Sequence, residues 1–178
     1  MAEGDIFMFR VCGRFEAART ASETGANKIA SLLDPGVALP RPKGVKPEDH
    51  LELAFEDLDD PGNPRSPTKG HVARLLAFGR RLRATDRVLI HCEGGMCRST
   101  AAALLLVSQA MGPGRTQEAM DKVAEVRPEA MPNPLIVALG AELLGRPELP
   151  EIAEAAARRG FSRRMQRLDA ESDRGRDF

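Results

Sequence analysis

One stretch of the sequence, residues 87–111, narrows the choice of folds more than any other. It reads RVLIHCEGGMCRSTAAALLLVSQAM, in which an apolar run from Arg87 to His91 leads through a glycine-containing loop to a second apolar segment, Thr100 to Met111. A short continuous apolar run is typical of a strand buried on both faces of a parallel sheet. We therefore predict a buried strand followed directly by a buried helix, as in α/β proteins.

The remaining sequence alternates between strand-like and helix-like segments. Further strands are expected at residues 6–12, 28–33 and 51–55. Helices are expected at residues 14–23, 66–82, 116–126, 133–144 and 147–168, with Ser66-Pro67 and Asn133-Pro134 as N-cap and first-turn pairs. This alternation predicts a single α/β domain with a central, mostly parallel sheet of four to five strands flanked by helices.

The composition excludes several classes of function. Lys plus Arg and Asp plus Glu number 26 each, so we expect no nucleic-acid partner. The longest apolar run, Ala101 to Val107, is far too short to span a bilayer, and we expect no membrane partner. An odd set of cysteines (Cys12, Cys92 and Cys97) behind an acidic start without a secretory leader favours a reducing compartment. The expected location is the cytoplasm.

The loop between the predicted strand and helix carries the residues that indicate chemistry. Gly94 and Gly95 stand where the helix begins, and successive backbone amides at such a place can surround an anion. The same positive field favours the thiolate form of Cys92. Arg98 can bind two oxygens of a phosphate at once, and Ser99 can donate a hydrogen bond to the sulfur. Together these residues predict phosphate chemistry with a thiolate nucleophile.

The same loop resembles the signature HCxxGxxR[ST] of the cysteine-dependent protein tyrosine phosphatases, of the dual-specificity-like kind. The resemblance implies a protein tyrosine phosphatase-like fold and hydrolysis of phosphomonoesters through a cysteinyl-phosphate, with no metal or other cofactor. It implies a catalytic domain over residues 1–146, followed at 147–178 by a helix and a frayed charged tail that packs on the domain or extends from it.

The resemblance also assigns roles to individual residues. Cys92 attacks phosphorus, Ser99 stabilises the sulfur as a leaving group, and His91 orients the loop. The phosphate is bound by Arg98 and by the loop backbone at Glu93, Gly94, Gly95, Met96 and Cys97. The implied substrate is a phosphorylated protein or a small phosphomonoester, and the sequence leaves open which of these it is, as well as the oligomeric state.

A general acid must protonate the departing oxygen and then activate water. The stretch LELAFEDL resembles the segment of dual-specificity phosphatases in which this acid directly follows a strand, and that alignment selects Asp57. The alternative is Asp60, because Asp60-Pro61-Gly62-Asn63-Pro64 resembles the acid loop of receptor-like tyrosine phosphatases. Asp59 is the third candidate. We favour Asp57, since its place at the strand end limits where its carboxylate can reach.

Two further observations refine this interpretation. Arg127 and Met131-Pro132-Asn133-Pro134 resemble the segment after the catalytic loop in dual-specificity phosphatases, where Asn133 is expected to cap a helix near the base of the loop. Glu93 and Met96 bring no positive charge to the variable loop positions. This composition argues against polyphosphoinositide substrates, whose extra phosphates call for cations.

Other interpretations of the loop remain open on the sequence alone. His91, Cys92 and Cys97 offer three zinc ligands without a fourth. A Cys92–Cys97 disulfide and a plain strand-to-helix turn are further alternatives. At the level of function, the alternatives are a phosphate-binding module without activity and a rhodanese-like sulfur-transfer enzyme.

Overall fold

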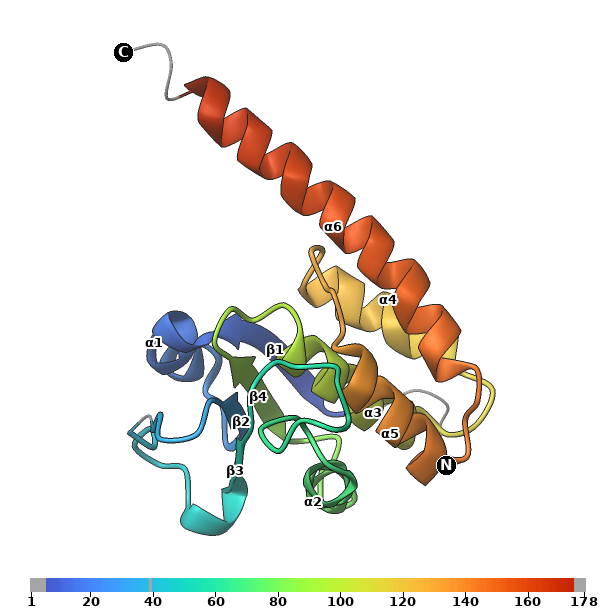
Figure 1. The fold of residues 1–178 in the computed structure, drawn as a ribbon. Helices are drawn as coiled ribbons and strands as arrows, with labels where there is room; N and C mark the ends of the chain where they lie inside the picture. Colours follow the sequence, from blue (N-terminus) through green and yellow to red (C-terminus); the bar gives the residue numbers. More distant parts are fainter. Residues whose placement is uncertain (1–5, 39, 175–178) are drawn as a thin grey trace.

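The computed structural model describes residues 6–38 and 40–174 and has a four-stranded sheet at its centre (Figure 1). The strands are β1 (Met8–Gly13), β2 (Lys28–Leu33), β3 (His50–Ala54) and β4 (Arg87–Cys92). They lie in the order β1-β4-β2-β3, and every pair is parallel. The predicted α/β fold with a parallel sheet is confirmed. The strand β4, which belongs to the stretch 87–111, lies between β1 and β2, and this interior position explains its apolar sequence.

Helices cover both faces of this sheet. One face packs on α1 (Arg14–Thr24) through a small apolar cluster that includes Cys12, Ala17 and Leu89. The other face carries the main core, and α2 (Lys69–Gly79) and α3 (Arg98–Met111) pack on it. Outside them, α4 (Thr116–Val126) and α5 (Pro134–Leu144) pack on α3, and the start of α6 (Leu149–Arg174) packs on α4 and α5. Alternate residues of β4 therefore face opposite cores: Val88, Ile90 and Cys92 belong to the main core, and Leu89 belongs to the smaller cluster.

The helix α3 is the most deeply buried element. Every residue from Arg98 to Ser108 is buried, and Leu104, Leu105 and Leu106 are fully inaccessible to solvent. A helix that is apolar all round has to be enclosed, and here neighbouring helices and the sheet enclose it. Because α3 cannot shift without opening the core, the residues of its first turn are held in place.

The start of α2 differs from the prediction. The N-cap is Thr68, whose side-chain oxygen accepts a hydrogen bond from the His71 backbone amide at 3.3 Å, and the helix ends at Gly79 instead of Leu82. Ser66 is not the cap because its hydroxyl donates to the carbonyl of Asp60 at 2.6 Å. A serine before a proline can serve either purpose, and tertiary contact decided between them.

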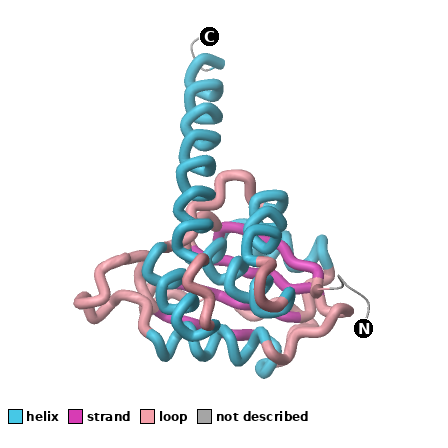
Figure 2. Tube along the Cα trace, turned by 90° about the vertical axis from the view of Figure 1, so that its right-hand side faces the viewer, coloured by secondary structure: helices cyan, strands magenta, loops and turns pink. Residues whose placement is uncertain are grey.

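The last helix, α6, is longer than predicted. Its first half packs on α4 and α5 through Leu149, Ala153 and Ala156, and its second half projects away from the domain (Figure 2). Residues 169–174, predicted to be part of a frayed tail, continue the helix, whose composition of Arg, Met, Gln, Leu and Ala favours that conformation. Residues 175–178 of that tail and residues 1–5 of the predicted domain lie outside the described residues. Among the helices that are described, none combines the length and apolarity needed to cross a membrane.

Candidate active site

The glycine loop, residues 93–97, joins the carboxyl end of β4 to the first turn of α3. Gly95 adopts a φ of 69°, and a Cβ atom there would lie 2.5 Å from the Gly13 nitrogen and closer still to the Cys12 carbonyl carbon. Only glycine fits such a position, because it needs both the left-handed conformation and the missing side chain. The loop therefore curls tightly against the end of β1, and we call the loop backbone that turns around the Cys92 sulfur the bowl.

The Cys92 thiol lies inside this bowl. The side chain is 2% exposed, its Sγ atom lies 3.2 Å from the Ser99 hydroxyl, and the Gly95 backbone amide donates a hydrogen bond to it at 3.2 Å. Two polar groups thus point at one sulfur beside the N-terminus of a buried helix. An amide donor at the N-terminus of a buried helix stabilises an oxyanion that comes to lie beside the sulfur.

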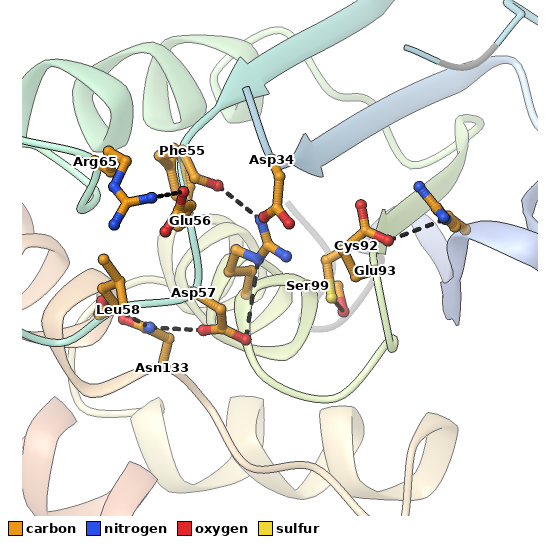
Figure 3. A network of polar contacts seen from close by, with 12 residues as sticks. Asp34, Phe55, Glu56, Asp57, Leu58, Arg65, Cys92, Glu93, Ser99 and Asn133 are labelled. Atoms are coloured by element: carbon orange, nitrogen blue, oxygen red, sulfur yellow. Dashed lines mark hydrogen bonds and ion pairs between the residues drawn. The ribbon is translucent and has the colours of Figure 1, made fainter. Parts of the chain in front are cut away.

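Arg98 is buried next to the bowl and is anchored through one nitrogen (Figure 3). Its Nη1 atom donates to the Asp34 carboxylate at 2.7 Å and to the Phe55 carbonyl at 2.7 Å. Its Nε atom is buried and has no hydrogen-bond partner among the described residues. An unpaired donor on a buried guanidinium is costly, and an anionic ligand in the bowl would satisfy it. Asp34 is not among the site residues predicted from the sequence.

Asp57 is the one candidate acid whose carboxylate points at Arg98. Its Oδ2 atom lies 3.9 Å from the Arg98 Nε, and about a third of its side chain is exposed. The Asp60 carboxylate instead accepts a hydrogen bond from the Gly62 amide at 2.8 Å, within its own turn. Asp59 is exposed. The structure therefore places the Asp57 carboxylate beside Arg98 (Figure 3), whereas the Asp60 carboxylate is bound within its own turn.

Asn133 holds this carboxylate in place. Its side-chain oxygen caps α5 by accepting from the Ile136 amide at 3.0 Å, as predicted. Its side-chain nitrogen donates to the Asp57 Oδ1 at 2.8 Å and to the Leu58 carbonyl at 3.1 Å. The sequence predicts the Asn133 cap but not the hydrogen bond from Asn133 to Asp57. The missed signal is that a capping asparagine, unlike serine, has an amide group left over to bind a second partner.

His91 lies on the opposite side of the strand from Cys92. Its Nε2 atom is 2.6 Å from the Ser31 hydroxyl, which is also 2.8 Å from the Nε2 of His50. One hydroxyl can donate to one ring and accept from the other, so the chain accommodates two neutral histidines. Burial, followed by the nearby His50, lowers the pKa of His91 to about 4. Its predicted role in orienting the loop stays a prediction.

The other loop side chains do not enter the bowl. Glu93 forms an ion pair with Arg14, with 3.0 Å between Oε2 and Nε, so its charge is compensated. Burial and the neighbouring Asp57 raise the pKa of the Cys97 thiol to about 12, which makes Cys97 a poor nucleophile. All three cysteines are free thiols, and the described residues contain no group of three or more His, Cys, Asp or Glu side chains placed to hold a metal ion.

Comparison with known proteins finds phosphatases that are similar to this chain. No family model matches the sequence. Mouse dual specificity protein phosphatase 15 is 28% identical over 123 residues, which are 68% of this chain and 49% of that protein. The chain thus spans about half the length of the curated relatives it matches.

Two solved structures share the fold. The PTP-2 phosphatase of Cydia pomonella matches with a TM-score of 0.57 and 22% identity, over 78% of this chain and 86% of that one. Human DUSP28 matches with a TM-score of 0.55 and 20% identity, over 83% and 92% of the two chains. These findings confirm the resemblance predicted from the loop. The chain is similar in sequence to a dual specificity phosphatase and shares the fold of these two solved phosphatases.

The buried His91 generates a prediction about pH. In the unfolded chain its pKa is 6.5, whereas in the folded protein it is about 4. Below pH 6.5 the unfolded state therefore takes up a proton that the folded state does not. The stability contributed by neutral His91 is present above that pH and is lost between pH 6.5 and 4, by about 2 kcal/mol at pH 5.

Replacing His91→Gln, which keeps an amide within reach of Ser31, removes this part of the pH dependence. Urea unfolding at pH 7 and pH 5 measures it. From pH 7 to pH 5, the free energy of unfolding of the wild type should fall by about 2 kcal/mol more than that of the variant. Equal losses in both proteins would contradict the assignment of His91 as a buried neutral imidazole.

Proposed function

We propose that this chain hydrolyses phosphate monoesters through a cysteinyl-phosphate intermediate. The observation that supports the proposal most strongly is the bowl itself. The Cys92 Sγ, the Gly95 amide and the Ser99 hydroxyl meet there, beside a buried Arg98 Nε that has no hydrogen-bond partner among the described residues. The names of the similar proteins, which are phosphatases, agree with it. Because these relatives are longer or only distantly similar, the activity of this chain is our own inference.

In the first step, the Cys92 thiolate attacks phosphorus and the bond from phosphorus to the ester oxygen breaks. Asp57, in its protonated form, gives its proton to that departing oxygen, so an alcohol leaves. The loop amides and the Arg98 Nε receive the three remaining phosphoryl oxygens, whose charge spreads in the transition state. The Nη1 atom, held by Asp34 and the Phe55 carbonyl, keeps the opposite edge of the guanidinium turned toward the bowl.

In the second step, water attacks phosphorus and the bond between sulfur and phosphorus breaks. The Asp57 carboxylate accepts the proton that water loses, and inorganic phosphate leaves. The Ser99 hydroxyl, 3.2 Å from the sulfur, stabilises the thiolate as it departs. The same carboxylate thus acts first as an acid and then as a base, and the Asn133 amide keeps it in range for both steps.

For the substrate we propose a phosphorylated protein, with tyrosine and serine or threonine phosphates both as candidates. The chain has no Tyr or Trp to form a deep aromatic wall around one phosphorylated residue. The variable loop positions Glu93 and Met96 bring no cation for additional phosphates, and the neighbouring Arg14 is already paired with Glu93. Both observations favour a single phosphate group on a polypeptide over a polyphosphorylated lipid head group.

The first test is Cys92→Ser with an aryl phosphate substrate. Turnover should fall by more than about a thousandfold, because a neutral hydroxyl is a far weaker nucleophile than a thiolate. Native mass spectrometry of rapidly quenched wild type should show a phosphate adduct that the variant lacks. A wild type that binds phosphopeptides but never turns over would instead indicate an inactive phosphate-binding module, and a persulfide on Cys92 would indicate sulfur transfer.

The second test compares Asp57→Asn with Asp60→Asn. We expect kcat for an aryl phosphate to fall by about a hundredfold or more in the Asp57 variant, because the proton donor is lost. The Asp60 variant serves as the matched control and should stay within about twofold, since that carboxylate binds its own turn. The reverse result would assign the acid to Asp60.

A third test addresses the positioning of Arg98. In Asp34→Ala the guanidinium keeps only the Phe55 carbonyl, and kcat/KM should fall by about tenfold, the effect of one hydrogen bond to a charged group at a half-exposed site. Asp34→Asn retains an acceptor for Nη1 and should recover most of the loss. An increase in kcat/KM for Asp34→Ala would mean that this carboxylate competes with the substrate phosphate.

A further inference from the structure

The projecting half of α6, residues 160–172, is anchored to the rim of the candidate active site. A Cβ atom on Gly160 would collide with the carbonyl oxygen of Ala130, so helix and loop backbones touch there. Arg167 pairs with Glu129 at 2.6 Å, and the Arg164 Nη1 lies 2.9 Å from the Met96 sulfur. Met96 belongs to the glycine loop. We call this segment distal α6.

The loop beneath distal α6 is itself bonded to the glycine loop. The Met131 amide donates to the Met96 carbonyl at 3.0 Å, and the Arg127 side chain donates to the Gly94 carbonyl at 3.2 Å. Distal α6 is therefore held at a defined place beside the bowl and then continues beyond the rest of the domain (Figures 1 and 2). A substrate bound by its phosphate has this helix as a neighbour.

Distal α6 presents an apolar stripe to solvent. Phe161, Met165 and Leu168 are 56%, 41% and 39% exposed, and they account for three of the six exposed large apolar side chains among the described residues. Their spacing of four and then three residues puts them on one face of the helix. At about 100° per residue, this face lies next to Arg164, on a flank of the helix that borders the glycine loop.

The segment is also basic, although the whole chain is neutral. Distal α6 and the two residues before it contain five arginines and two carboxylates, Asp169 and Glu171. Two further carboxylates lie against this segment: Glu154 pairs with Arg158, and Glu129 pairs with Arg164 and Arg167. Arg158 and Arg164 border the apolar stripe on its two sides, by the same helical spacing. Such a surface complements a partner that combines apolar with acidic side chains.

The size of the stripe decides what kind of partner fits. A standard protein interface buries about 800 Å² on each partner, whereas three partly exposed side chains on one helix offer on the order of a few hundred Å². The stripe extends from Phe161 to Leu168, a rise of about 10 Å along the helix, which an extended peptide covers with about three residues. These dimensions suit a short peptide segment better than a second copy of the chain.

We propose that distal α6 is a docking surface for the polypeptide of the substrate. The apolar stripe binds an apolar side chain a few residues from the phosphorylated residue. Acidic side chains of the same segment take the place of Glu154 and Glu129 beside the bordering arginines. This inference rests on the proposed function in that the glycine loop holds the phosphate. It adds that the enzyme selects its substrate by the sequence around the phosphorylated residue.

The test measures binding, so it does not require turnover. Two phosphotyrosyl peptides of equal length are labelled with a fluorophore, one flanked on both sides by Leu and Glu, the other by Ser and Gly. Anisotropy titrations use the Cys92→Ser variant, which cannot consume the peptides, with and without the triple substitution Phe161→Ser, Met165→Ser and Leu168→Ser. A Met8→Ser variant is the matched control, because Met8 is 54% exposed at the far end of β1.

With the stripe intact, the Leu/Glu peptide should bind at least about fivefold more tightly than the Ser/Gly peptide. The triple substitution should abolish this difference, the Met8 variant should preserve it, and circular dichroism should show equal helix content in all of them. Equal affinity for both peptides with the stripe intact would overturn the proposal. A separate assay tests the proposed function: if the wild type does not hydrolyse an aryl phosphate, the proposed function fails, whatever the peptides show.

Two other occupants of the stripe have their own signatures. Sedimentation that shows a dimer of the wild type and a monomer of the triple variant would assign the stripe to a second copy of the chain. Cosedimentation of the wild type, but not of the triple variant, with phosphatidylserine-containing vesicles would assign it to a lipid surface. Either result, without discrimination between the two peptides, overturns the docking proposal.

Discussion

Gly95 lies so close to the end of β1 that no other residue fits, and the rest of the site depends on this contact. The left-handed turn at Gly95 brings its amide to the Cys92 sulfur, and the packing against Cys12 and Gly13 prevents the loop from opening. Because β1 and β4 are parallel neighbours, both strands end at the same edge of the sheet. The bowl therefore exists only where these two strand ends meet.

Arg98 connects this bowl to the other half of the sheet. Its guanidinium binds Asp34, which follows β2, and the Phe55 carbonyl, which follows β3, while Asp57 stands a little farther along the chain from β3. The carboxyl ends of all four strands thus contribute to one site, which is the usual place for ligands in parallel α/β sheets. A single buried charge holds these segments in register, and distal α6 adds a surface at the rim.

Several of these features follow from local sequence. The strand–loop–helix from residue 87 to 111 was predictable because its apolar run, its paired glycines and its apolar helix lie next to each other in the chain. The cap at Asn133 was predictable for the same reason. The cap at Ser66 was predicted wrongly, since its hydroxyl binds Asp60 and leaves Thr68 to begin α2. The extra turns of α6 were missed because a charged sequence resembles a frayed end.

What the sequence determined by itself is the identity of the residues in the glycine loop and the class of fold, because both depend on neighbours within about a dozen positions. Only the tertiary structure decided that Asp34 binds Arg98 across 64 residues, that Asn133 holds Asp57 across 76, and that Ser31 binds His91 across 60. Such pairs have no local pattern. They arise when parallel strands bring distant segments to one edge, where a buried polar group must find a partner.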